Sequence, residues 1–216
     1  MGVVPKEALK GPDGTVVDVE GGGRFVVLSP GFEDVKDVFE RSAQKVLAKD
    51  LGVVVAKTGM EKGWRVLDAG TGSGVAALFF ARFAKSVVSY DVVAERSRLA
   101  EKNAEMIGVT NVLFKTGDVF EGVEERGVDL FFLDVPEPHR ALVSARAALR
   151  PGGFLVVYTP HILQALSVVR SAGSGEWLYE GTFEVIEREW LVDERRLRPH
   201  SGLLHTAFLT FLRKLF

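Results

Sequence analysis

The chain has 216 residues, 47% of them hydrophobic, and a formal net charge of −2 at neutral pH. That length and composition allow a full hydrophobic core, so we expect about one domain with a small appendage. The lack of cysteine excludes disulfides and thiolate metal sites, and no uncharged apolar run of about 18 residues predicts a membrane span.

The first residues and the net charge bear on where the protein acts and what it binds. Met1–Lys6 has too short an apolar run for a signal peptide, so we expect a cytoplasmic protein without membrane contact. The near-neutral charge gives no global basic surface for nucleic acid. A local basic patch, Arg188 with Arg195, Arg196 and Arg198, is interpreted either as a solvated face or as a set of phosphate contacts.

The first sixty residues differ in pattern from the rest. Residues 1–30 are rich in glycine, and apolar runs at 15–19 and 24–28 flank Gly21–Gly23, which predicts a short β-hairpin. Residues 31–60 are interpreted as a helical linker, because apolar side chains recur there at helical spacing. Residues 61–216 then form the main domain.

The main domain alternates strand and helix patterns from residue 64 onward. We predict strands at 64–69, 86–91, 111–116, 128–134 and 153–159, and helices at 73–84, 93–107, 138–149 and 160–172. Such alternation is typical of a parallel sheet with crossover helices. Two strand-like runs, 182–192 and 205–214, follow without a helix between them, and we expect them to close the sheet as an antiparallel hairpin.

The segment 66–74, VLDAGTGSG, predicts a buried strand, a glycine turn and the start of a helix. Glycines let the backbone turn tightly and approach a ligand that a Cβ would block. A dinucleotide fingerprint needs its third glycine where this chain has Val75, so that fold is disfavoured. The pattern D-x-G-x-G-x-G resembles the cofactor turn of class I methyltransferases that use S-adenosylmethionine, which implies cofactor contacts from Gly70, Thr71, Gly72, Ser73 and Gly74.

Acidic residues at or just beyond strand ends extend the predicted cofactor site. Asp91 ends the second strand, where its carboxylate can accept hydrogen bonds from both hydroxyls of a ribose. Asp118 can accept from the adenine amine while Val119 packs on the ring; alternatively, Asp118 is a turn or N-cap aspartate. Asp68 is expected to tie the glycine turn by accepting backbone N–H bonds.

Asp134 follows the strongly apolar stretch 128–133 and precedes two prolines. A carboxylate at the end of so apolar a strand needs a polar partner, and Pro136 and Pro138 fix a rigid loop beside it. We expect Asp134 to face the methyl group of the cofactor. The alternative is that it caps the next helix.

Taken together, the chain resembles the tRNA (adenine-N1)-methyltransferases that methylate a T-loop adenine, usually at tRNA position 58. Two segments are specific to that family, and the others occur in many methyltransferases. The specific ones are Asp134–Pro138 and His205–Leu209; the others are Arg41–Gln44 with Lys49–Asp50, Ala69–Gly74, Ser89–Asp91, Arg150–Tyr158 and Arg188–Trp190.

This resemblance implies a Rossmann-like class I methyltransferase fold, with a mainly parallel seven-stranded sheet and a C-terminal antiparallel hairpin. It implies methyl transfer to N1 of adenine, S-adenosylmethionine as the cofactor, no metal, tRNA as the substrate and a homotetramer. Asp134 becomes the catalytic residue and also contacts the cofactor. Gln44 and Val92 join the cofactor site, and Pro136, His139, Arg198 and His205 are expected to contact the substrate.

The chain departs from the family in two sequence positions and in the length of its N-terminal segment. His139 stands where the family usually has tryptophan and would stack on a base with a smaller face, or is simply a surface histidine. Leu47-Ala48 replaces a tyrosine-proline pair. Two other functions stay open: a small-molecule methyltransferase resembling the precorrin decarboxylating enzymes, and a non-catalytic RNA-binding partner subunit.

Overall fold

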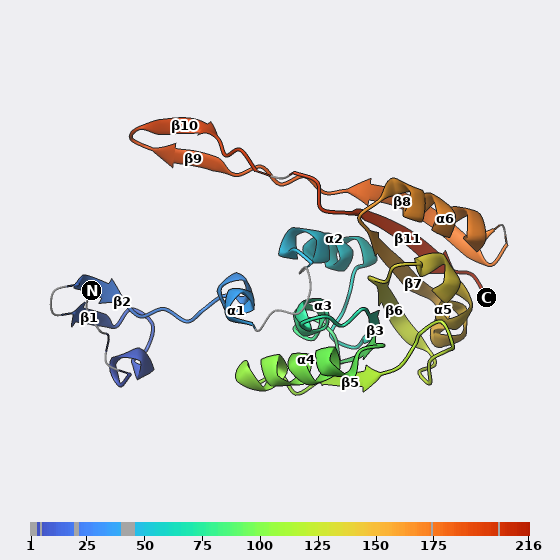
Figure 1. The fold of residues 1–216 in the computed structure, drawn as a ribbon, viewed down its shortest axis with the longest axis horizontal. Helices are drawn as coiled ribbons and strands as arrows, with labels where there is room; N and C mark the ends of the chain where they lie inside the picture. The colour runs from blue at the N-terminus through green and yellow to red at the C-terminus, as the bar shows by residue number, and fades with distance from the viewer. Residues whose placement is uncertain (1–3, 5, 20–21, 40–45, 174, 203) are drawn as a thin grey trace. The chain divides into compact units, whose positions relative to one another are not determined.

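A computed structural model of the chain describes residues 4, 6–19, 22–39, 46–173, 175–202 and 204–216. It separates two compact units, Met1–Phe39 and Glu40–Phe216 (Figure 1). The first unit contains a 3-10 turn η1 (Ala8–Lys10), a helix α1 (Phe32–Val38) and a two-stranded antiparallel pair of β1 (Val16–Val19) with β2 (Gly23–Val26). The strands flank Gly22, at the position where the sequence indicates a hairpin.

The second unit is built on a seven-stranded sheet with the order β5-β4-β3-β6-β7-β11-β8 (Figure 1). Five neighbouring strands are parallel, and β11 runs antiparallel between β7 and β8. The bounds are β3 Arg65–Ala69, β4 Ser86–Asp91, β5 Val112–Thr116, β6 Val128–Leu133, β7 Leu149–Thr159, β8 Trp177–Glu184 and β11 Phe208–Lys214. The predicted fold, a mainly parallel seven-stranded sheet with a C-terminal antiparallel pair, is confirmed.

Two groups of helices cover the sheet. The chain runs outward from β3 through β4 to β5 in one direction and from β6 to β7 in the other, so right-handed crossovers place the two groups on opposite faces. One group contains α2 (Ala48–Thr58), α3 (Val75–Phe80) and α4 (Ala94–Met106); the other contains η2 (Pro138–Ala141), α5 (Leu142–Ala148) and α6 (Ile162–Ala172). The order of strands reverses between β3 and β6, and ligands of such sheets bind beyond the strand ends at that point.

The buried core explains why the central strands read as apolar runs. Leu67 of β3, Phe131 of β6 and Leu155 of β7 are fully buried. Strands covered by helices on both faces lack a solvent side and therefore show no polar alternation. No helix in the described part of the chain is long and apolar enough to cross a membrane.

Three sequence predictions need correction. The helix predicted at 73–84 is only Val75–Phe80, and the one predicted at 138–149 begins as a 3-10 turn, because the loop prolines restrict the backbone there. The strand predicted at 153–159 begins at Leu149, since Pro151–Gly153 is accommodated as an irregularity in the pairing of β7 with β6. The remaining elements of the parallel sheet lie within a few residues of their predicted bounds.

The largest correction concerns the strand predicted at 182–192. The strand that pairs with β11 is β8, and it ends at Glu184. Residues farther along form a separate antiparallel pair, β9 (Trp190–Asp193) and β10 (Arg196–Pro199), drawn beyond the ends of β8 and β11 in Figure 1. Its apolar side chains mimic a core strand in the sequence, but Trp190 is 57% exposed and Val192 is 73% exposed.

Candidate active site

Glycines shape the turn that follows β3. Gly70, Gly72 and Gly74 have φ angles of 93°, 55° and 86°, in the left-handed region that favours glycine. A Cβ at Gly70 would lie 2.0 Å from the carbonyl oxygen of Asp134, and a Cβ at Gly74 would lie 2.9 Å from the Cβ of Ala100. Packing within the protein therefore requires glycine at positions 70 and 74, in addition to any approach of a ligand.

The carboxylate of Asp91, at the end of β4, ties the glycine turn to the loop before α4. Its Oδ2 accepts a hydrogen bond from the Gly72 amide at 3.1 Å, and its Oδ1 accepts one from the Val93 amide at 2.9 Å. Nη1 of Arg96 lies 3.5 Å from Oδ1. A carboxylate offers about four lone-pair sites, so two remain for donors such as ribose hydroxyls.

Asp68 holds the turn through hydroxyl groups rather than through backbone amides, which corrects the sequence prediction. Its Oδ2 accepts from Oγ of Ser89 at 2.5 Å, and Oγ of Ser89 lies 2.6 Å from Oγ1 of Thr71. Because Ser89 donates its only proton to Asp68, Thr71 donates to Ser89. Burial raises the pKa of Asp68 to about 7.

Asp134 follows β6 and is the second carboxyl group with a raised pKa. Its backbone amide donates to the carbonyl oxygen of Ala69 at 2.8 Å, which places it beside the glycine turn. In the described part of the chain no group donates a hydrogen bond to its carboxylate, and burial raises its pKa to about 7. The next helical turn has Glu137 as its N-cap, so Asp134 does not cap it.

A pocket of about 330 Å³ at the switch point of the sheet is lined by the glycine turn, Asp91 and Asp134, but not by Asp68. The glycine turn, Asp91 and Arg96 form one side of it. The other side is formed by Asp134, Pro136, Tyr158, Gln164 and Thr206. Burial, together with the negative charges of Asp50 and Asp134, raises the pKa of Tyr158, so its hydroxyl stays protonated and neutral.

The pocket brings together only part of the predicted site. Its lining includes Thr71, Ser73 and Pro136, but not Gly74, Val92, Asp118 or Val119. Oδ1 of Asp118 accepts from the Phe120 amide at 2.8 Å, as in the turn interpretation, and Val119 is buried. Gln44 lies outside the described residues.

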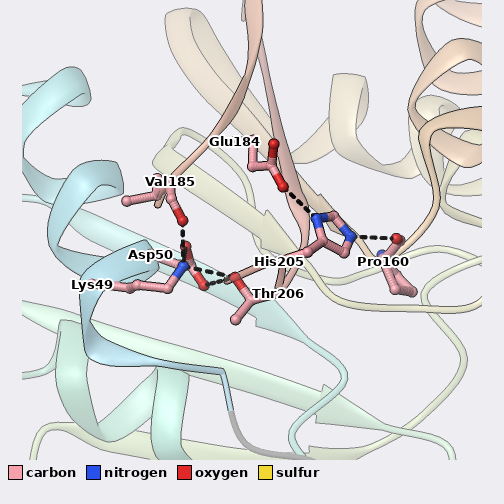
Figure 2. A network of polar contacts seen from close by, with 7 residues as sticks. All are labelled: Lys49, Asp50, Pro160, Glu184, Val185, His205 and Thr206. Atoms are coloured by element: carbon pink, nitrogen blue, oxygen red, sulfur yellow. Dashed lines mark hydrogen bonds and ion pairs between the residues drawn. The ribbon is translucent and has the colours of Figure 1, made fainter. Parts of the chain in front are cut away.

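The predicted substrate residues other than Pro136 lie outside this pocket. His139 is part of η2, and Arg198 is an exposed residue of β10. His205 lies beside the pocket, where Nδ1 is 2.6 Å from Oε1 of Glu184 and Nε2 is 3.0 Å from the carbonyl oxygen of Pro160 (Figure 2). Because both partners accept hydrogen bonds, this geometry suits the doubly protonated imidazolium, and both bonds raise the pKa of His205.

A buried ion pair next to the pocket was not predicted from the sequence. Nζ of Lys49 lies 2.7 Å from Oδ1 of Asp50, in the first turn of α2, and the same ammonium contacts Thr206 (Figure 2). Tyr158 and Arg96 were also missed as pocket residues. The resemblance includes the Lys49-Asp50 pair and ends one of its segments on Tyr158, so family motifs carry a signal that the strand and helix pattern lacks.

The chain is similar in sequence to known tRNA methyltransferases. The family model described as the GCD14 subunit of the tRNA methyltransferase complex matches residues 23–210. The tRNA (adenine(58)-N(1))-methyltransferase TrmI of Thermus thermophilus is 39% identical over 221 residues, which cover 99% of this chain and 86% of that protein.

Solved structures are also similar to this chain. The tRNA (m1A58) methyltransferase TrmI of Aquifex aeolicus superposes with a TM-score of 0.85 at 27% identity, covering 100% of this chain and 90% of that one. A SAM-dependent O-methyltransferase of Thermotoga maritima gives 0.86 at 27% identity, covering 94% and 78%. A precorrin 8w decarboxylase from Methanobacterium thermoautotrophicum, with a TM-score of 0.64 and 17% identity over 83% and 98% of the chains, shares the fold alone.

Proposed function

The chain belongs to the family of the GCD14 subunit of the tRNA methyltransferase complex, and from this premise we propose that it methylates N1 of an adenine in the T-loop of tRNA, with S-adenosylmethionine as the donor. The observation that carries the proposal is a single pocket in which the glycine turn and Asp91 face Asp134. The similarity to the Thermus and Aquifex enzymes over almost the whole chain supports this choice of substrate.

The residues of the turn suit the proposed cofactor. When bound, S-adenosylmethionine supplies a methyl group on a sulfonium, already activated for transfer. Asp91 has two lone-pair sites left for the ribose hydroxyls. Gly72, which donates to Asp91, has no side chain that would block a ligand beside this carboxylate. Asp118 and Val119 are the proposed contacts of the adenine of the cofactor, and Gln44 and Val92 are further proposed cofactor contacts.

Asp134 is the proposed catalytic residue. N1 of adenine already carries a free lone pair at neutral pH, so a strong base is not required and positioning supplies most of the acceleration. As the bond from N1 to the methyl carbon forms and the carbon–sulfur bond breaks, positive charge develops on the ring. The Asp134 carboxylate, which has no hydrogen-bond donor within the described residues, accepts from the exocyclic amine and stabilises that charge.

Binding of folded tRNA requires more than the pocket. The T-loop adenine has to be extruded from the folded RNA before it reaches Asp134. Pro136, His139, Arg198 and His205 are the proposed substrate contacts. A cytoplasmic homotetramer combines basic patches from several subunits and so reconciles a net charge of −2 with a nucleic-acid substrate.

The two competing functions have less support. The precorrin enzyme shares the fold at 17% identity, whereas the tRNA enzymes match in sequence as well. A non-catalytic subunit has no need of the cofactor turn, and this chain keeps that turn together with Asp91 and Asp134 around one pocket.

The decisive experiment incubates the purified protein with labelled S-adenosylmethionine and an unmodified tRNA transcript. We expect label in N1-methyladenosine at the T-loop adenine and none when that nucleotide is changed to guanosine. Tetrapyrrole acids serve as the competing acceptors. Label in a tetrapyrrole but not in tRNA would replace the proposed function with the first alternative.

A further inference from the structure

A second pocket lies next to the one that contains Asp134. It has a volume of about 570 Å³ and is lined mainly by apolar groups. Pro160 and Thr206 line both pockets, so the two pockets adjoin. The other lining residues come from the start of α6 and from the segment that leads into β11: His161, Ile162, Leu163, His205 and Phe208. A polymeric ligand with one group in the first pocket can therefore place the next group in the second.

The His205 side chain presents ring surface, rather than hydrogen-bonding atoms, to the second pocket. Its Nδ1 is 2.6 Å from Oε1 of Glu184 and its Nε2 is 3.0 Å from the carbonyl oxygen of Pro160, so both ring nitrogens already have partners (Figure 2). The side chain is nevertheless 41% exposed. The exposed part therefore consists mainly of ring face and ring carbon, and two bonds to different segments fix the plane of the ring.

The groups around this ring are apolar. The centroid of the Phe208 ring lies 4.9 Å from that of His205. Ile162 and Leu163, which line the same pocket, are exposed. Single exposed apolar side chains are ordinary on a protein surface, but here they share one pocket with a fixed aromatic ring. Such a pocket favours a flat ligand that binds through its face.

Extrusion of a base from folded RNA creates a ligand of this kind. When the target base leaves the stack, the adjacent base loses a stacking partner, which is unfavourable. Proteins that bind unpaired RNA stack such bases on aromatic side chains, histidine among them. Stacking needs no hydrogen bonds to the edge of the base, so a mainly apolar pocket can supply it.

We propose that the second pocket binds the base of a nucleotide adjacent to the methylated adenine in the RNA chain, and that this base stacks on the ring of His205. Glu184 and Pro160 hold the ring in place for that contact. The inference rests on the proposed function and deepens it, because it gives a second nucleotide a binding site and His205 a defined contact.

The test is a double-mutant cycle between the enzyme and the tRNA. One transcript is complete, and two others carry an abasic ribose immediately 5′ or immediately 3′ of the target adenosine. The value of kcat/KM is measured for each transcript with each enzyme variant. We expect loss of the base at one of the two positions to cost the wild-type enzyme roughly tenfold, and to cost His205→Ala nothing further. Any effect of the missing base on tRNA folding is common to all variants and cancels.

Two further variants separate stacking from hydrogen bonding. His205→Phe keeps an aromatic face and should keep the sensitivity to the missing base. His205→Gln keeps hydrogen-bonding groups for Glu184 and Pro160 but has no ring, and it should lose that sensitivity. It also replaces His205→Ala in the cycle if melting temperature or cofactor affinity shows that the alanine variant fails to fold.

The matched control is His200→Ala. His200 is an exposed histidine and is not among the described residues that line either pocket. We expect this variant to show the wild-type sensitivity to the missing base.

The outcomes separate failure of this inference from failure of the proposed function. Equal losses in the wild-type enzyme and in His205→Gln, at both abasic positions, overturn the stacking site. The same result with a lower oligomer mass for His205→Gln in sedimentation would instead assign the pocket to contact between copies of the chain. A wild-type enzyme that binds S-adenosylmethionine but leaves the complete transcript unlabelled overturns the proposed function.

Discussion

The two sides of the pocket are assembled in different ways. The cofactor side comes from two segments that are close in the sequence, the turn after β3 and the end of β4, and the backbone amides of Gly72 and Val93 fix Asp91. The acceptor side is drawn from the ends of β6 and β7, from α6 and from the segment before β11, and a lysine from α2 braces it.

This difference separates two kinds of chemical constraint. The cofactor side is set by backbone conformation, so its residues are mainly glycines and one carboxylate in a fixed pattern. The acceptor side is formed by side chains from segments that are distant in the sequence. Substitutions there can therefore alter which methyl acceptor binds without altering the glycine turn. That division fits a fold in which one cofactor serves many acceptors.

The largest expected effect is that of Gly70→Ala. This change affects both sides of the pocket, because Gly70 of the cofactor side packs against Asp134 of the acceptor side. The new Cβ would overlap the Asp134 carbonyl oxygen and sit at a φ of 93°. We expect unfolding to require roughly 2–5 kcal/mol less free energy, measured by denaturant titration. Gly59→Ala is the matched control, since its φ is 66° with open space around it. An equal loss in both variants would mean that the overlap contributes nothing.

Asp134→Asn tests the acceptor side alone. Asparagine keeps the size but lacks the charge that supports a cationic ring, so we expect kcat to fall by roughly 100- to 1000-fold with little change in cofactor affinity. Single-turnover kinetics and calorimetry with S-adenosylhomocysteine measure the two quantities. Wild-type turnover in this variant would remove Asp134 from catalysis.

Asp91→Ala tests the cofactor side alone. The loss of hydrogen bonds from ribose hydroxyls to a charged acceptor should weaken cofactor binding by about 1.5–3 kcal/mol, measured by calorimetry. The same variant frees the amides of Gly72 and Val93, so its melting temperature is recorded in parallel. Unchanged cofactor affinity in a folded variant would contradict the assignment of Asp91.

The same contrast explains what the sequence predicts. The strand, turn and helix start at 66–81 are local, and so are the signals that indicate them: an apolar run, spaced glycines and a following acid. Asp134 is also found locally, as a carboxylate between an apolar strand and two prolines. These residues line one pocket because the carboxyl ends of parallel strands meet at one edge of the sheet.

Contacts across long sequence separations could not be predicted in this way. Lys49 and Thr206 are 157 positions apart, and no periodicity indicates that their side chains meet. The misplaced strand at 182–192 has a related cause, because the exposed apolar side chains of β9 imitate the pattern of a buried strand. The sequence pattern shows which residues are apolar, but tertiary packing decides which of them are buried.

The smallest expected effect is the dependence of kcat on pH, which concerns the acceptor side. Asp134 acts as a carboxylate and has a pKa raised to about 7, so kcat should be roughly tenfold lower near pH 6 than near pH 8. Stability should change in the opposite sense. A carboxyl whose pKa is higher in the folded than in the unfolded state stabilises the fold while protonated, and that contribution is lost as pH rises through about 7.

Asp68 titrates in the same range and its charge is coupled to that of Asp134, so two variants are needed to assign the pH profile of the rate. Asp68→Asn should keep the rise of kcat with pH, because Asp68 lies behind Ser89 and Thr71 on the cofactor side. Asp134→Asn should abolish that rise and leave a flat profile of the residual rate, since the group that must lose its proton is gone. A rise that persists in Asp134→Asn and vanishes in Asp68→Asn would transfer the titration to the cofactor side, and with it the charge that supports methyl transfer.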